Sequence, residues 1–139
     1  MSARHFLAEV LELLRMQLPP ELREFESVGP WHGLIKVHYG DPSAHYEVWM
    51  QRRHKQIELG LHFEGSAQDN SHYLESLLGR MGEIRGQLGP GAEPEQWTLN
   101  WTRLHETIDL QPLDEDFLME LTGRLSRYIR VLQPMVEEA

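Results

Sequence analysis

The chain contains no cysteine. Disulfide bonds, catalysis by a thiolate and zinc sites built from cysteine are therefore excluded. The sequence also has no apolar run approaching the ~20 residues of a membrane-spanning helix. The opening segment, MSARHFLAEVLELLRMQL, carries charges through its centre and lacks a small-residue cleavage pattern, so no secretory signal is expected. Together these absences predict a cytoplasmic protein.

Positive charge is in short supply. Thirteen Lys and Arg residues stand against 22 Asp and Glu residues, which gives a formal net charge of −9. Nucleic acids and anionic membranes are bound through positive surfaces, so we expect neither as a partner. With 40% hydrophobic and 25% charged residues, the 139-residue chain has the composition of an ordinary globular protein. A single domain over residues 1–139 is expected.

Apolar spacing predicts the fold class. Helical periodicity covers residues 3–18, residues 69–88 and a last helix that Asp114 caps. Alternation of apolar and polar residues predicts strands over residues 33–40, 45–51, 56–64 and 96–104, and HETIDL (105–110) extends the last strand or forms a fifth. The segment GPGAEPE (89–95) is expected to be a loop. The prediction is an α/β (α+β) fold in the order α-β-β-β-α-β-(β)-α, with three helices on the apolar face of a mainly antiparallel, four- or five-stranded sheet.

The predicted register of the sheet gathers histidines on its other face. Turns at Arg53-His54 and at residues 40–43 place apolar residues opposite one another, as a buried face requires. The same register lines up His38, His45 and His62 in one row. Side chains that face each other across strands lie close enough to share a divalent metal, with Glu47 or Glu64 as an outer partner. The alternative is a histidine surface that faces solvent or a partner.

Other residues suggest a binding surface. Gly79, Gly82 and Gly86 share one side of the predicted helix 69–88, away from its leucine stripe, which favours close approach by another helix, a loop or a second subunit. Trp31 and Trp49 are expected on the surface, where tryptophan is favoured at contact centres. Trp97 and Trp101 are expected in the core. On the last helix, Arg124 is expected to face solvent and pair with Glu120.

Catalytic motifs are missing. The patterns H-E-x-x-H, G-x-S-x-G, G-x-x-x-x-G-K-[ST] and G-x-G-x-x-G after a strand do not occur. Since each of these motifs belongs to a defined enzyme class, their absence favours binding over catalysis.

The order α-β-β-β-α-β resembles the core of the restriction-endonuclease-like fold. The segments IELGLHFEG, LESLLGRMGEIRGQLG, WTRLHETIDL and LTGRLSRYIRVLQPMVE resemble an uncharacterised bacterial family of similar length, over residues 45–137. The resemblance implies an acid at the start of one strand, for which Asp41 is available, and a (D/E)-x-K motif on the next. Neither Glu47-Val48-Trp49 nor Glu58-Leu59-Gly60 has the lysine. The resemblance therefore implies a member that does not cleave DNA.

The order also resembles that of small acidic type III secretion chaperones, which form dimers and bind extended client segments. From the residues and these resemblances, we expect a non-catalytic protein-interaction or assembly module that forms a homodimer and binds a protein or peptide. A metal-dependent hydrolase or degenerate nuclease-like protein that uses the His-rich sheet face is the alternative. A chaperone-like dimer is the second alternative.

Overall fold

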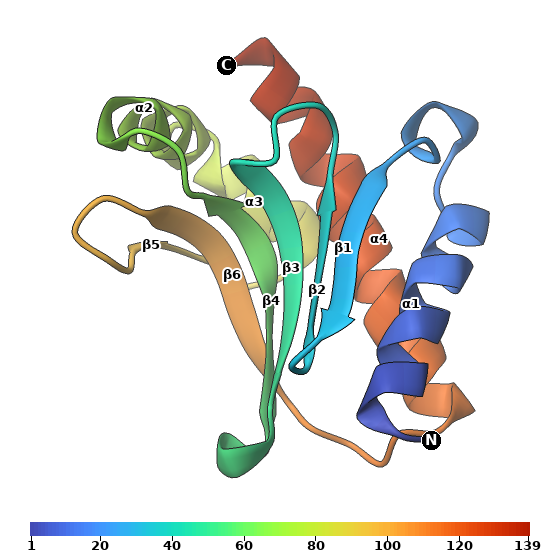
Figure 1. The fold of residues 1–139 in the computed structure, drawn as a ribbon. Coiled ribbons are helices and arrows are strands. Elements are labelled where there is room, and N and C mark those ends of the chain that lie inside the picture. The colour runs from blue at the N-terminus through green and yellow to red at the C-terminus, as the bar shows by residue number, and fades with distance from the viewer.

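The computed structural model describes residues 1–139, which form four α-helices packed on one six-stranded sheet (Figure 1). The helices are α1 (Ala3–Gln17), α2 (Ala67–Leu78), α3 (Met81–Leu88) and α4 (Glu115–Glu138). The strands are β1 (Glu26–Trp31), β2 (Leu34–His38), β3 (Ala44–Gln51), β4 (Gln56–Phe63), β5 (Glu93–Gln96) and β6 (Thr102–Asp109). Two short 3-10 turns occupy Pro20–Leu22 and Arg52–His54. The α+β class is confirmed.

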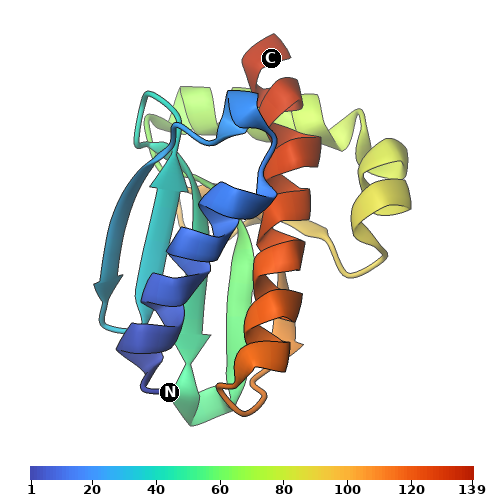
Figure 2. The same cartoon turned by 90° about the vertical axis from the view of Figure 1, so that its right-hand side faces the viewer.

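Every neighbouring pair of strands is antiparallel, in the order β1-β2-β3-β4-β6-β5. Helices α1 and α4 lie side by side against one face of the sheet (Figures 1 and 2). The core between these layers is built from the alternating apolar residues of the central strands and the stripes of the two helices. It includes Val37, Tyr46, Val48, Ile57, Leu59, Leu61, Phe6, Val10, Leu14, Leu121, Leu125 and Ile129. No helix is long and apolar enough to cross a membrane.

Two strands were not predicted, and both lie at edges of the sheet. Strand β1 is almost wholly exposed, so its residues lack the apolar alternation that marks a half-buried strand. Strand β5 overlaps the end of the predicted loop 89–95, is four residues long and contains Pro94. Proline is tolerated there because an edge strand leaves one row of backbone donors unused. Alternation of apolar residues therefore does not predict edge strands that contain few apolar residues.

The predicted helix 69–88 is divided into α2 and α3. Ser66 caps α2 by accepting a hydrogen bond from the Asp69 N–H. The chain leaves helical geometry at Arg80, which follows the flexible Gly79. The break lets α3 turn and pack on α4, burying Ile84, while Leu78 of the predicted stripe is left exposed.

Arg124 was expected to face solvent, and this was wrong. Its Nη2 lies 2.5 and 2.6 Å from the two carboxylate oxygens of Glu106, which is buried on the helix-covered face of β6. The Tyr128 hydroxyl donates to the same carboxylate at 2.8 Å. This charged network ties α4 to the sheet beside the apolar core.

Gly60 allows β4 and β6 to approach each other. A Cβ at this position would lie 2.4 Å from the Leu104 carbonyl oxygen and 2.5 Å from the His105 Cβ.

Gly60→Ala is therefore expected to lower the free energy of unfolding by about 1–3 kcal/mol, as measured by guanidinium denaturation. The control is Gly86→Ala in α3, where a Cβ would meet nothing within 4 Å. Alanine is the better helix former, so this control should gain about 0.5–1 kcal/mol. Equal stability of the Gly60 variant and the wild type would contradict the close approach.

Candidate metal centre

The face of the sheet opposite α1 and α4 carries the predicted histidine row. His38 pairs with His45, and His45 pairs with His62, across β2, β3 and β4. The predicted register is confirmed over these strands, including Val48 opposite Leu59 on the apolar face. Side chains alternate between the two faces, so packing of the apolar face aligns the histidines on the other.

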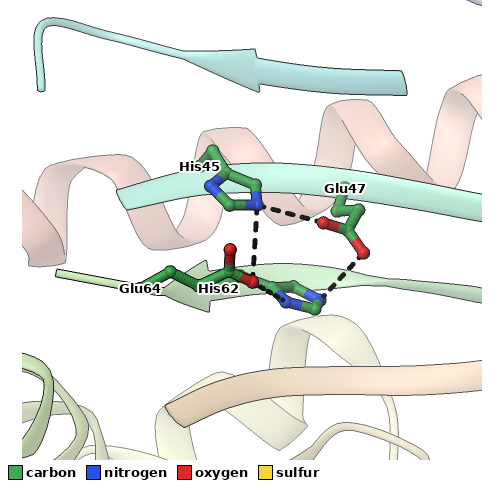
Figure 3. A group of neighbouring side chains, drawn as sticks. All are labelled: His45, Glu47, His62 and Glu64. Carbon is green, nitrogen blue, oxygen red and sulfur yellow. Dashed lines mark hydrogen bonds and ion pairs between the residues drawn. The ribbon is translucent and has the colours of Figure 1, made fainter. Parts of the chain in front are cut away.

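Four side chains on this face form a compact group, the His/Glu cluster, made of His45, Glu47, His62 and Glu64 (Figure 3). His45 and Glu47 lie on β3, and His62 lies on β4 with Glu64 directly after the strand, so each glutamate follows its histidine by two residues and points to the same face. One ligand atom from each of the four residues lies within 4.8 Å of all the others. The two imidazole rings stack with centroids 5.5 Å apart. Backbone pairing continues beyond β4 because the Glu64 N–H donates to the Ser43 carbonyl at 2.7 Å, which holds Glu64 beside the row.

Contacts of both ring nitrogens hold the His45 side chain in one orientation. Nδ1 lies 3.0 Å from the carbonyl oxygen of Pro42, which only accepts, so Nδ1 carries a proton. Nε2 then points into the cluster, 3.0 Å from Glu47 and 3.9 Å from Glu64. An imidazole whose outer nitrogen donates to a backbone carbonyl has its inner nitrogen oriented for a metal, as in known metal sites.

His62 lies between carboxylates on both sides. Nδ1 is 3.1 Å from Glu64 and Nε2 is 3.0 Å from Glu58, and carboxylates accept hydrogen bonds. Burial alone would lower the pKa of His62, but the hydrogen bonds to Glu58 and Glu64 and the nearby charges raise that pKa to about 9. Without a metal, His62 is therefore an imidazolium at neutral pH.

Glu58 is the outer partner of His62. Its carboxylate is 1% exposed and also lies 3.2 Å from His105 and 3.7 Å from Arg103. Burial alone would raise its pKa, but interactions with His105 and His62 lower that pKa to about 2. Glu58 is thus a fixed negative charge behind His62, a carboxylate that would orient the imidazole toward a metal.

The cluster is buried although no helix covers this face. The side chains of His45, Glu47, His62 and Glu64 are 3%, 8%, 0% and 13% exposed. Trp97 packs edge-on against His62 with ring centroids 5.5 Å apart, and the guanidinium of Arg103 lies 4.6 Å from the Trp97 ring centre. The β5–β6 hairpin therefore shields one side of the cluster. Trp97 and the partly exposed Trp101 are not core residues, contrary to expectation.

The donor set suits a divalent transition metal. Two imidazole nitrogens and two carboxylates form a mixed N/O set, which suits zinc and similar first-row ions better than magnesium or calcium. Ligand atoms around a tetrahedral zinc with bonds of about 2.0–2.1 Å lie roughly 3.3 Å apart. His45 Nε2 lies 3.0 Å from Glu47 and 3.9 Å from Glu64, and His62 Nδ1 lies 3.1 Å from Glu64, so these contacts lie on both sides of that separation. Small side-chain rotations would therefore form a coordination shell.

Not all of the residues predicted for the metal site lie in the His/Glu cluster. His38 belongs to the row but not to the cluster, because its Nε2 bonds to Glu26 at 3.1 Å. Glu47 and Glu64, expected as outer partners, lie among the ligand atoms, and the outer partner is Glu58. The repeated H-x-E pattern at 45–47 and 62–64 could have indicated both glutamates. Glu58, His105 and Trp97 reach the site through the fold and had no signal of their own.

The predicted binding residues are spread over the surface. Trp31 and Trp49 are exposed, as expected. A Cβ at Gly82 or Gly86 would meet nothing within 4 Å, and one at Gly79 would meet only carbonyl oxygens of its own helix. No part of the chain packs on these glycines, so a second subunit at this position stays a prediction. Asp41, the acid that the nuclease-like resemblance would use, is exposed and accepts a hydrogen bond from the Ser43 N–H at 2.9 Å.

Comparisons with known proteins found no matching family model, no similar curated protein and no similar solved structure.

The buried charges predict how the stability of the metal-free protein depends on pH. The pKa of His62 is raised from 6.5 to about 9. The contribution of His62 to the free energy of unfolding is therefore complete below pH 6.5 and is lost as the pH rises through 9. The pKa of Glu58 is lowered from 4.5 to about 2. The contribution of Glu58 to the free energy of unfolding is therefore complete above pH 4.5 and is lost as the pH falls through 2. The free energy of unfolding, measured in chelator by urea denaturation, should be highest between these limits. His62→Gln should flatten the alkaline decline, whereas the exposed-site control His5→Gln should keep it. An unchanged decline in the His62 variant would contradict this assignment.

Proposed function

We propose that this protein binds one divalent transition metal ion, zinc being the best fit, through His45, Glu47, His62 and Glu64. The observation that carries the proposal is the convergence of four donors within 4.8 Å, three of them buried and Glu64 half-buried, on β3, β4 and the residue that follows β4. Buried carboxylates and imidazoles cost desolvation free energy unless they are paired or coordinate a metal. The outer contacts of His45 with Pro42 and of His62 with Glu58 are those that orient histidine ligands.

The metal would serve binding or stabilisation rather than catalysis. Four protein ligands complete a tetrahedral zinc shell, whereas catalytic zinc sites keep one position open for water or substrate. Three of the donors are buried and Glu64 is half-buried, and the larger surface cavities are lined by other residues. Both observations favour the non-catalytic reading of the sequence over a metal-dependent hydrolase.

Zinc should bind with one-to-one stoichiometry in isothermal titration calorimetry and in metal analysis after desalting. Because the metal binds the native state, zinc at 100 times its dissociation constant should add about 2.7 kcal/mol to the free energy of unfolding. Magnesium should add little, because half of the donors are imidazole nitrogens. The thermal midpoint is the direct readout.

Matched variants locate the site. His45→Ala and Glu47→Gln should each lose the zinc-dependent rise in the thermal midpoint. His38 is the third histidine of the row and bonds to Glu26 outside the cluster. The control variant His38→Ala should therefore keep the zinc-dependent rise in the thermal midpoint. If no divalent metal shifts the midpoint, or if His45→Ala keeps the full shift, the proposal fails.

A further inference from the structure

A row of apolar residues, with an exposed tryptophan at each end, lies on the same face of the sheet, toward the other end of β3 from His45. The register places Trp31 opposite Leu34 and Leu34 opposite Trp49, so the three side chains share this face. Trp31 is 65% exposed and Trp49 is 39% exposed. Four residues separate His45 from Trp49, about 13 Å along an extended strand, so this row is distinct from the His/Glu cluster. Large exposed aromatic side chains of this kind mark interaction sites.

The turn between β3 and β4 places unpaired positive charge beside Trp49. Arg52, Arg53, His54 and Lys55 are consecutive and exposed in this turn, at the bottom of Figure 1. Four arginines elsewhere in the chain pair with glutamates, namely Arg80 with Glu83 and Glu138, Arg85 with Glu93, Arg103 with Glu95, and Arg124 with Glu106. None of the cations of this turn makes such a pair. The turn is therefore a local positive patch on a chain of net charge −9.

A cavity joins the tryptophan to the basic turn. It has a volume of about 390 Å³ and is lined by Trp49, Gln51, Arg52, Arg53, His54 and Gln56. Gln56 donates a hydrogen bond to the Gln51 side chain at 2.8 Å, which links two lining residues across the ends of β3 and β4. The lining thus combines the Trp49 indole with the guanidinium groups of Arg52 and Arg53. Such a cavity fits an apolar side chain flanked by carboxylates.

We propose that this surface binds an acidic peptide segment of a partner protein, with one aromatic or aliphatic side chain packed on Trp49. Charge complementarity selects the partner, because carboxylates flanking the anchor would meet Arg52 and Arg53. A short acidic segment needs only this local patch. A nucleic acid would extend its phosphates beyond the patch over a chain with 22 Asp and Glu residues, which opposes it.

The test starts with selection of phage-displayed random dodecapeptides on the immobilised full chain. Enriched peptides are expected to carry at least two Asp or Glu residues beside a large apolar residue. The most enriched sequence, synthesised with a fluorescent label, then serves as the probe in fluorescence polarisation. Trp49→Ala should weaken its binding about tenfold or more. The Arg52→Glu/Arg53→Glu double variant should weaken it at least as much, and rising salt should weaken wild-type binding.

A charge-matched control separates this patch from general electrostatics. Arg127→Glu/Arg130→Glu changes the net charge equally, at exposed positions of α4 on the other side of the sheet. This control should bind the probe within about twofold of the wild type. Circular dichroism would verify that each variant is folded.

Four outcomes of the peptide experiments would overturn the proposal. They are failure to enrich any sequence, enrichment of peptides without acidic residues, equal loss of binding in the two charge-reversal variants, and full binding by Trp49→Ala. Binding of a single-stranded oligonucleotide that depends on Arg52 and Arg53, with no peptide selected, would also overturn it and assign the surface to nucleic acid. None of these results depends on whether the His/Glu cluster holds a metal.

Discussion

The antiparallel pairing of β3 with β4 determines where the His/Glu cluster and the surface around Trp49 lie. Eight consecutive residue pairs join the two strands, from Ala44 opposite Phe63 to Gln51 opposite Gln56. On one face this pairing buries Val48 against Leu59, and on the other it sets His45 opposite His62. Because side chains alternate with a period of two, a slip by one residue would expose the core and bury the cluster residues against the helices. Packing of the apolar face thus holds the donors of the polar face in register.

A slip by two residues would keep the apolar pattern but separate the histidines. The turn at residues 52–55 opposes such a slip, because Lys55 adopts a left-handed conformation (φ 51°) that closes the connection. Its carbonyl also accepts a hydrogen bond from the Leu110 N–H at 2.9 Å, which ties the turn to the chain after β6. The turn that carries the positive charge therefore also maintains the histidine pairing.

The cluster is also preorganised by groups that touch no metal. His45 is oriented by the carbonyl of Pro42, and His62 by Glu58, which in turn lies beside His105 and Arg103. Gly60 leaves room for β6 to bring His105 and Arg103 to this position. Buried charges are tolerated here because each has partners of the opposite sign. A metal would replace one set of partners with another at little cost in chain entropy.

The two ends of this sheet face suit different tasks. The His45 end is buried, polar and closed by Trp97, whereas the Trp49 end is exposed, aromatic and basic. Under both proposals, the metal would stabilise the strands that present a peptide-binding surface. Glu58 lies opposite Trp49 in the register and contacts His62, so one residue adjoins both sites.

The sequence by itself determined the central strands, the two long terminal helices, the apolar face and the histidine row, because periodicity and capping are local properties. The expected cap Asp114 shows this, since its side chain accepts a hydrogen bond from the Phe117 N–H at the start of α4. Tertiary structure alone decided that His38 turns to Glu26 while Glu64 joins the cluster, and that Arg124 lies on Glu106. It also decided the places of β1 and β5, whose exposed residues carry no periodic pattern. The physical reason is that ion-pair partners and edge strands are chosen by residues distant in sequence, which local spacing does not encode.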